Sequence, residues 1–274
     1  MFEEISKVIL LSDMDGTLLD SKKNIGEADR EAIRRFTALG GKFSVATGRT
    51  IQSFRQYADI LELKSPVIMY NGAAIYDYTS EKLLFTSPLP ESARETAREI
   101  LAEMPEAGGE VLRPEGTYIF RDNDYEQLHT KICGIVPEYA DLDDIPSGNW
   151  LKVLFAMSPE NIPLIELLVR KKGYDTVDFV RSAEIFFEMM PPGVSKGSAL
   201  TQYRSLEGME GYTFVSVGDF DNDTEMIKAA DLGACPANAE ASVKKAADLV
   251  LTRTNDEGAV AELIDHIITL CGKS

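Results

Sequence analysis

Short apolar runs alternate with segments of helical spacing in the first third of the chain. The apolar run at residues 8–11 predicts a buried strand, and residues 27–39 carry apolar side chains at helical spacing. The alternation continues with strands expected at residues 43–46 and 66–70 and a helix expected at residues 50–61. Strands and helices that alternate in this way are typical of a parallel sheet with helical crossovers.

The middle of the chain has a different pattern, because its strands alternate in polarity. Such alternation predicts sheets with one face exposed to water, which is typical of antiparallel pairing. The strands are expected at residues 117–121, 151–157 and 176–181, and the helices at residues 91–104, 123–134 and 159–172. We therefore expect an inserted α+β domain at residues 85–184.

The last third returns to the first pattern. We expect helices at residues 196–206, 223–230 and 258–270, and strands at residues 213–217 and 232–235. Residues 1–84 and 185–274 are therefore expected to form one α/β core around a parallel sheet. The length of 274 residues allows either one large α/β domain or two domains.

Composition excludes several classes of partner. The net charge of −17, from 45 acidic and 28 basic residues, disfavours nucleic acid and anionic membranes, since both attract a positive surface. No stretch approaches the roughly 18 apolar residues that a membrane helix needs. The acidic N-terminal sequence lacks the basic region of a signal peptide, so we expect a cytoplasmic protein.

Cysteine and histidine offer little chemistry in this sequence. The three cysteines lie far apart, which argues against a disulfide framework and favours a reducing compartment. His129 and His266 are the two histidines, and we expect both to be ordinary helix residues. A zinc site or a histidine-based triad is therefore not expected.

The first candidate site follows the first apolar run, where Asp13 and Asp15 precede Gly16. Ligands of open α/β sheets bind at the carboxyl ends of the strands. Two carboxylates this close resist joint ionisation unless a cation lies between them, and Mg²⁺ typically takes one or two carboxylates plus phosphate oxygens. The alternative is an acidic turn that merely closes the strand.

Two further clusters lie at expected helix starts. Thr47, Gly48 and Arg49 would place a hydroxyl and free N–H groups where a phosphate oxygen can bind, although a plain helix cap has the same composition. Lys196 begins the helix expected at residues 196–206, where a cation is unfavourable for the helix dipole. Pairing with carboxylates or a phosphate would explain that lysine, and a solvated surface lysine is the alternative.

The last cluster follows the strand expected at residues 213–217. Asp219, Asp221, Asn222 and Asp223 supply carboxylate and amide oxygens, the ligands suited to Mg²⁺. Calcium is the competing interpretation, but the run lacks the spaced ligands, central glycine and terminal glutamate of an EF-hand loop.

Taken in order, these clusters resemble the four motifs of the haloacid dehalogenase-like hydrolases. The matching residues are Asp13-x-Asp15-Gly16-Thr17-Leu18, Thr47-Gly48-Arg49, Lys196-Gly197 and Gly218-Asp219-x-x-Asn222-Asp223. The Cof-type branch of capped phosphatases is indicated by Asn71-Gly72-Ala73, Ala237-Asn238-Ala239 and residues 256–260. That branch places its cap between the second and third motifs, which implies a Rossmann-like parallel sheet core with an inserted α+β cap domain. The sequence departs from the branch at Phe220-Asp221 and Cys235-Pro236.

The resemblance implies an aspartyl-phosphate mechanism. Asp13 would be the nucleophile, Asp15 would be the acid and base, and Lys196 would contact the phosphoryl group. Mg²⁺ would be held by Asp13, the Asp15 backbone carbonyl and Asp219, with Asn222 and Asp223 orienting the ligands. Whether Asp221 or Asp223 reaches the metal directly stays open.

The same resemblance assigns the substrate contacts. Thr47 and Gly48, with Lys196, would bind the phosphate, while Arg49 and Asn71 would contact the rest of the substrate. The expected activity is Mg²⁺-dependent hydrolysis of phosphate monoesters of small metabolites, such as sugar phosphates or phosphorylated cofactors, by a monomer or homodimer. A sugar phosphomutase and a non-catalytic metabolite-binding regulator on the same fold are the alternatives.

Overall fold

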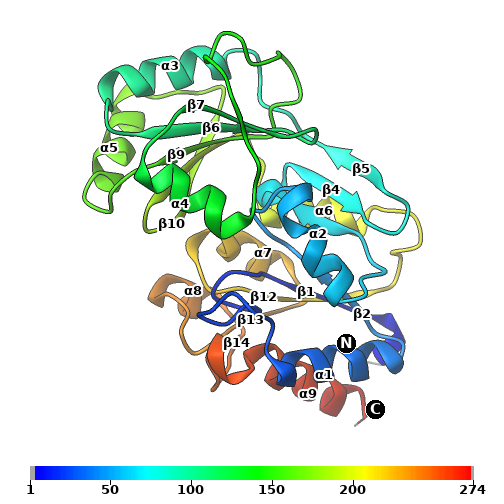
Figure 1. The fold of residues 1–274 in the computed structure, drawn as a ribbon. Helices are drawn as coiled ribbons and strands as arrows, with labels where there is room; N and C mark the ends of the chain where they lie inside the picture. The colour runs from blue at the N-terminus through cyan, green and yellow to red at the C-terminus, as the bar shows by residue number, and fades with distance from the viewer. Residues whose placement is uncertain (1–3, 273–274) are drawn as a thin grey trace. The chain divides into compact units, whose positions relative to one another are not determined.

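The computed structural model describes residues 4–272, which divide into two compact units (Figure 1). The first unit takes in the chain up to Thr47, Gln56–Phe85 and the chain from Ser195 onward. The second takes in Gly48–Arg55 and Thr86–Val194. The assignment of residues 85–184 to a cap stays a prediction.

The first unit is built around a parallel sheet. Among residues 4–272 this sheet has five strands in the order β14-β13-β12-β1-β2, and neighbouring strands pair in parallel. The strands are β1 (Val8–Ser12), β2 (Lys42–Val45), β12 (Thr213–Val217), β13 (Leu232–Cys235) and β14 (Leu249–Val250). All five residues of β1 are buried, as expected for a central strand covered on both faces. The predicted parallel sheet is confirmed.

Helices cover both faces of this sheet. Ile9 and Leu11 of β1 pack with residues of α6 (Lys196–Arg204) and α7 (Thr224–Ala229) in one apolar cluster. On the opposite side, α1 (Glu27–Ala38) and α9 (Ala259–Cys271) lie side by side (Figure 1). The unit also contains the short helix α8 (Ala241–Ala246) and 3₁₀ turns at Ile5–Lys7, Tyr70–Gly72, Asp221–Asp223 and Asn255–Glu257.

The strand expected at residues 66–70 forms, but it is not a member of the five-stranded parallel sheet, so that part of the prediction was wrong. β3 (Val67–Met69) pairs antiparallel with β4 (Ala74–Asp77), and with β5 (Lys82–Thr86) they form a separate three-stranded sheet among the described residues. A single parallel bridge, Ala46 to Ile68, links β3 to the end of β2. The chain reverses after β3 because Tyr70, Asn71 and Gly72 all have positive φ. The helix α2 (Ile51–Ile60) precedes β3.

The second unit contains a mixed sheet that is almost entirely antiparallel. Within residues 4–272 it has six strands in the order β10-β11-β9-β6-β7-β8, and only the last pair is parallel. The strands are β6 (Gly108–Leu112), β7 (Thr117–Arg121), β8 (Glu138–Tyr139), β9 (Lys152–Ala156), β10 (Asp178–Ala183) and β11 (Phe186–Met190). The antiparallel pairing was predicted, whereas β6, β8 and β11 were not.

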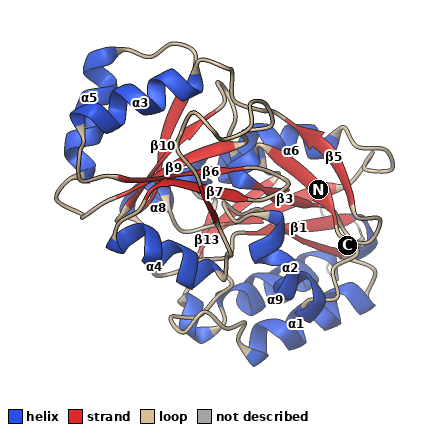
Figure 2. Cartoon of the chain, turned by 45° about the horizontal axis from the view of Figure 1, so that its top comes forward, coloured by secondary structure: helices blue, strands red, loops and turns tan. Residues whose placement is uncertain are grey.

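The two faces of this sheet have different covers. α3 (Ala93–Glu103) and α5 (Ile162–Lys172) pack on the face that carries Val111 and Val153. Glu110, the neighbour of Val111, points to the other face because side chains alternate along a strand. There α4 (Asp124–Cys133) packs against β6 and β9. Figure 2 shows α4 apart from the pair formed by α3 and α5.

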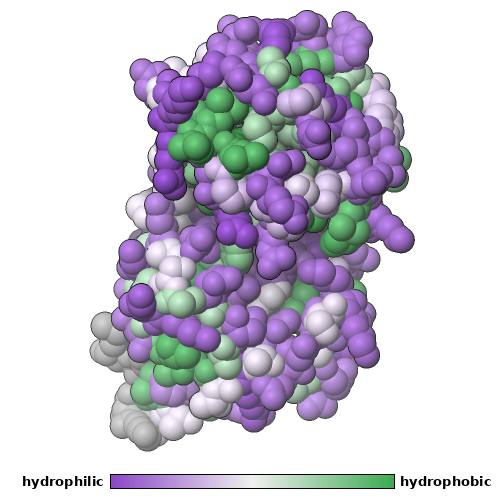
Figure 3. Space-filling view, turned by 90° about the vertical axis from the view of Figure 1, so that its left-hand side faces the viewer, coloured by the Kyte–Doolittle hydropathy of each residue, from purple (hydrophilic) through white to green (hydrophobic). Residues whose placement is uncertain are grey.

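The face of the molecule drawn in Figure 3 is largely hydrophilic. Purple, hydrophilic residues predominate on the face drawn in Figure 3, with separate green patches between them. Large apolar side chains that remain exposed include Leu164 and Leu167 on α5. Within the described part of the chain, no helix is both long enough and apolar enough to cross a membrane.

α1 and α9 are joined by a buried carboxylate. Asp29 Oδ1 accepts a hydrogen bond of 2.7 Å from the Ala261 N–H in the first turn of α9. Burial outweighs this hydrogen bond and raises the pKa of Asp29 to about 6. The folded state therefore keeps the proton to higher pH than the unfolded chain does, and its stability falls as pH rises from about 4 through about 6.

We predict that Asp29→Asn removes part of this pH dependence while keeping the hydrogen-bond acceptor. As pH rises from about 5 to about 7.5, the unfolding free energy of the wild type should fall by about 1 kcal/mol more than that of the variant. Urea unfolding at both pH values measures the change. The matched control is Glu31→Gln, at an exposed position of α1, which should follow the wild type. The same curve for Asp29→Asn and wild type would refute the charge effect.

Candidate active site

The ends of two neighbouring parallel strands bring the first candidate residues together. Asp13 directly follows β1, and Gly218 and Asp219 follow β12, which pairs with β1. The Asp13 N–H donates a hydrogen bond of 2.9 Å to Val217 O, so the hydrogen bonding between β1 and β12 extends as far as Asp13. Parallel strands end at the same edge of the sheet, which is where open α/β sheets bind ligands.

Lys196 reaches this edge from the first residue of α6. Its Nζ lies 2.6 Å from Asp13 Oδ1 and 2.6 Å from Asp223 Oδ1, and only 1% of the residue is exposed. Burial by itself would lower the pKa of Lys196, but the charges of the two carboxylates outweigh it and raise that pKa. The alternative of a solvated surface lysine is therefore wrong, and the unfavourable place of this cation in the helix is offset by two ion pairs.

Three carboxylates surround this ammonium group. Asp13, Asp219 and Asp223 each offer an oxygen, and these atoms all lie within 4.8 Å of one another. Burial, together with the charges of Asp223 and Asp219, raises the pKa of Asp13 well above its usual range, although Lys196 opposes the shift. Burial and the charge of Asp223 raise the pKa of Asp219 to about 7. Three carboxylates against one ammonium leave an excess of negative charge that a divalent cation bound by oxygens would neutralise.

Asp223 and Asp219 differ in how their oxygens are used. Asp223 Oδ2 accepts the N–H groups of Asp219 at 3.0 Å and Phe220 at 3.1 Å, while its Oδ1 contacts Lys196. Asp223 therefore fixes both the backbone turn at Asp219 and Phe220 and the position of the Lys196 ammonium group. Asp219 accepts one hydrogen bond of 2.7 Å on Oδ1, from the Thr17 hydroxyl. The Thr17 hydroxyl therefore orients the Asp219 carboxylate.

Gly16 allows the two motifs to approach each other. Its φ of +85° is strained for any other residue, and a Cβ at this position would lie 2.4 Å from Asp219 Oδ2. Its carbonyl accepts a hydrogen bond of 2.8 Å from Asn238 Nδ2. Asn238 also accepts the Asn255 N–H at 2.9 Å, so the loop after β1 is fixed by residues near the end of the chain. Asn238 carried no predicted role, although it belongs to a motif of the Cof-type resemblance.

The two predicted asparagines contact each other. Asn222 Nδ2 donates to Asn71 Oδ1 at 3.1 Å, and the Asn71 N–H donates to Thr47 O at 3.0 Å. The turn after β3 is thereby tied to the motif after β12 and to the end of β2. Asn222 was predicted to orient metal ligands and Asn71 to contact substrate, and both assignments stay predictions.

Asp15 lies apart from the three clustered carboxylates. Its side chain is 39% exposed and forms an ion pair of 2.8 Å with Lys23. A carboxylate that remains accessible to solvent is suited to exchange protons with a substrate and water. Sequence reasoning missed Lys23, because a single lysine in a turn carries no motif.

Three other predicted residues have contacts of their own. Asp221 Oδ1 accepts a hydrogen bond of 2.8 Å from the Ser242 hydroxyl of α8. Gly48 and Arg49 belong to the second unit, where Lys152 Nζ donates to Gly48 O at 2.9 Å. Arg49 is buried, with 5% of the residue exposed.

Comparisons with known proteins agree with the motifs. A family model described as haloacid dehalogenase-like hydrolase matches residues 10–264. The YxeH protein of Bacillus subtilis (strain 168) is 30% identical over 240 residues, covering 84% of this chain and 87% of that protein. The 5-amino-6-(5-phospho-D-ribitylamino)uracil phosphatase YcsE of the same organism is 29% identical over 248 residues, covering 89% of each.

The fold is shared with solved structures. A haloacid dehalogenase-like hydrolase from Bacteroides thetaiotaomicron superposes with a TM-score of 0.82 at 27% identity, covering 95% of this chain and 99% of that one. This likeness confirms the predicted α/β class, and the family match confirms the resemblance inferred from the motifs. The chain therefore belongs to the haloacid dehalogenase-like hydrolases, in the Cof-type branch of phosphatases that its motifs indicated.

Proposed function

We propose that this protein is a Mg²⁺-dependent phosphatase that hydrolyses phosphate monoesters of small metabolites through an aspartyl-phosphate intermediate. The observation that carries the proposal is the buried Lys196, which joins Asp13 to Asp223 within a cluster of carboxylates. The name of the relative YcsE, a phosphatase of a phosphoribityl compound, supports the substrate class. Sugar phosphates and phosphorylated cofactors are the leading candidates.

Asp13 and Asp15 would divide the chemistry. In the first step an Asp13 carboxylate oxygen forms a bond to phosphorus while the bond to the leaving oxygen breaks, and Asp15 gives that oxygen a proton. In the second step Asp15 takes a proton from water and the water oxygen forms a bond to phosphorus. The bond between phosphorus and the Asp13 oxygen breaks, which restores the Asp13 carboxylate and yields inorganic phosphate. The exposed side chain of Asp15 and the buried side chain of Asp13 suit these different tasks.

Lys196 would stabilise the transferred group. An ammonium group has three donors, and Asp13 and Asp223 use two of them, which leaves one for a phosphoryl oxygen. Thr47 would hold a second oxygen from the end of β2. Such fixed donors stabilise charge that develops in the transition state. The phosphate contact of Gly48 and the substrate contact of Arg49 stay predictions from the sequence.

The carboxylate cluster fits a metal ion. Phosphatases of this family generally use a divalent metal, and Asp13, Asp219 and the Asp15 backbone carbonyl would hold it here. Asp223 and Asn222 would orient these ligands through the contacts described above. Mg²⁺ is the proposed ion because every ligand is an oxygen, and it would neutralise charge on the phosphoryl group.

We predict that Asp13→Asn abolishes phosphate release and leaves the fold intact, because the amide keeps the shape of the carboxylate but is not a nucleophile. Release from an aryl phosphate, with Mg²⁺ and with excess chelator, measures the effect, and circular dichroism checks the fold. The control Asp59→Asn changes an exposed carboxylate of α2 and should keep most of the activity. Near-normal turnover by Asp13→Asn would contradict the nucleophile assignment. Isomerised sugar phosphate in place of free phosphate would identify a phosphomutase.

Lys196→Ala should lower kcat by a factor on the order of 10² to 10³, the usual effect of losing one fixed donor to the transition state. Steady-state kinetics with the same aryl phosphate would measure it, after a melting curve has shown that the variant is folded. Lys228→Ala removes an exposed lysine of α7 and serves as the matched control. A loss of only about twofold would count against contact between Lys196 and the phosphoryl group.

Gly16→Ala should weaken metal binding, because the new Cβ would displace the Asp219 carboxylate. We expect the Mg²⁺ concentration for half-maximal activity to rise by about tenfold or more, comparable to the loss of an outer partner of a metal ligand. Gly116→Ala is the matched control, since a Cβ there meets no atom within 4 Å. An unchanged Mg²⁺ requirement in Gly16→Ala would argue that Asp219 is not a ligand.

A further inference from the structure

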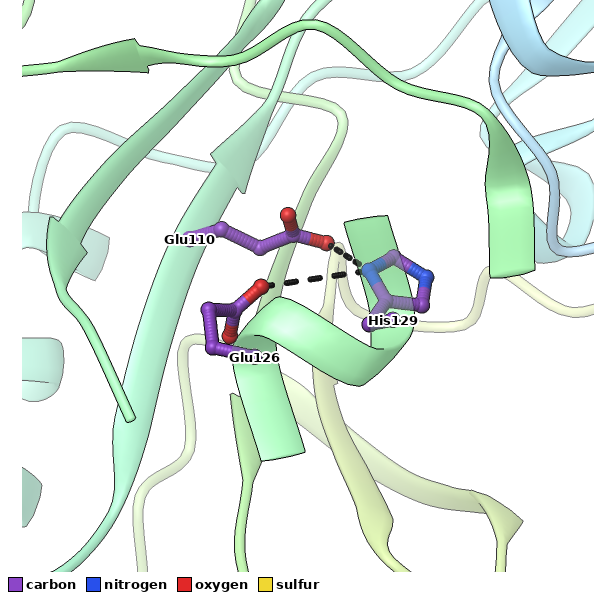
Figure 4. A group of neighbouring side chains, drawn as sticks. All are labelled: Glu110, Glu126 and His129. Atoms are coloured by element: carbon purple, nitrogen blue, oxygen red, sulfur yellow. Dashed lines mark ion pairs between the residues drawn. The ribbon is translucent and has the colours of Figure 1, made fainter. Parts of the chain in front are cut away.

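Three ionisable side chains converge in the second unit, in the layer between α4 and its sheet. Figure 4 shows Glu110 on β6 facing Glu126 and His129 on α4. Glu126 and His129 are three residues apart, so they lie on the same face of the helix. One ligand atom from each residue lies within 4.8 Å of the others.

The two carboxylates are buried without hydrogen-bond partners. Glu110 and Glu126 are both 0% exposed, and none of their four oxygens has a hydrogen-bond partner within residues 4–272. An unpaired carboxylate in the protein interior costs several kcal/mol, so such groups are normally paired with a cation or coordinate a metal. The two carboxylates therefore need positive charge beside them, which either a protonated His129 or a metal ion can supply.

The imidazole is directed at both carboxylates. His129 Nδ1 lies 2.9 Å from Glu110 Oε1 and 3.9 Å from Glu126 Oε1, and neither contact has hydrogen-bond geometry (Figure 4). A tetrahedral Zn²⁺ with bonds of about 2.0–2.2 Å separates neighbouring ligand atoms by about 3.4 Å. The two distances from His129 lie on either side of this value, and all three ligand atoms lie within 4.8 Å of one another, so modest side-chain shifts would place one cation between them.

The surroundings hold the imidazole in place. The Phe186 ring lies edge-on to it, with centroids 4.9 Å apart, and the Cys133 thiol lies beside it one turn further along α4. Groups around a metal ligand commonly fix its orientation in this way. The His129 side chain is 10% exposed, which leaves an edge through which an ion could enter.

We propose that Glu110, Glu126 and His129 form a second metal site, which binds a divalent transition-metal cation, best matched by Zn²⁺, and ties α4 to β6. Two carboxylates and one neutral imidazole neutralise a double positive charge, and water would complete a tetrahedral shell. Mg²⁺ fits poorly, because it keeps several waters and prefers oxygen ligands. This site goes beyond the proposed phosphatase activity and does not depend on it.

Protons are the competing occupants of this cluster. In the absence of a cation, burial and the charge of Glu110 raise the pKa of Glu126 well above its usual range. Against the effect of burial, Glu110 and, after it, Cys133 raise the pKa of His129. Without a metal ion, both Glu126 and His129 therefore keep a proton to higher pH than they would in water. A metal ion requires both carboxylates ionised and the imidazole neutral, so the two states differ in a measurable way.

The histidines allow a selective test on the full-length chain. In protein labelled with ¹⁵N-histidine, stripped with chelator and held in excess Mg²⁺, Zn²⁺ is added while the imidazole nitrogens are followed by NMR. We expect the His129 Nδ1 signal to move to a metal-bound position with stoichiometric Zn²⁺, while the exposed His266 of α9 does not change. The site at Asp13 contains no histidine, so this readout reports Glu110, Glu126 and His129 alone. A His129 ring that stays doubly protonated in excess Zn²⁺ would overturn the proposal.

A conservative variant provides the second measurement. Glu126→Gln keeps the shape of the side chain and removes its charge, and it should weaken Zn²⁺ binding at His129 by roughly 10- to 100-fold. The matched control is Glu138→Gln on β8, where the side chain is exposed. Equal Zn²⁺ affinity in Glu126→Gln and wild type would also refute the site. If Glu126→Gln fails to fold, the measurement on the wild type still decides.

Discussion

The buried ion pairs of Lys196 are the interaction on which the proposed active site depends. They join the end of β1, the start of α6 and the turn after β12, three segments that lie far apart in the sequence. A charge with 1% exposure is tolerated only when it is paired, so the ammonium and its carboxylates must arrive together. Folding of the first unit and assembly of its site are therefore one event, and the donors are fixed before a substrate binds.

The two acidic clusters show how donor type separates two kinds of metal chemistry within one chain. The cluster of Asp13, Asp219 and Asp223 offers oxygen ligands next to a lysine, which suits Mg²⁺ and a phosphoryl group. The cluster of Glu110, Glu126 and His129 adds a nitrogen ligand in a drier setting, which suits a transition metal. Because the first cluster would serve chemistry and the second would fasten a helix to a sheet, each can be tested without disturbing the other.

Much of the fold was predictable from local patterns, and the predictions that failed did so for physical reasons. The buried run of β1 and the helical spacing of α1 identified the parallel sheet and its crossovers. β6 was missed because two glycines begin it and all five of its residues are buried, which removes the alternation expected of a strand. β3 was assigned to the wrong sheet because the reversal at residues 70–72 depends on positive φ angles that an apolar pattern does not reveal.

The sequence by itself determined the family, the residue types at each strand end and the positions of Asp13, Lys196 and Asp219 in its motifs, because spacing along the chain is local information. Only the tertiary structure decided which side chains meet. It turned Thr17 toward Asp219, paired Asp15 with Lys23, and brought Glu110 against His129, for which no motif prepared us. The reason is that these contacts depend on the packing of whole elements, which buries charge and so dictates its partners.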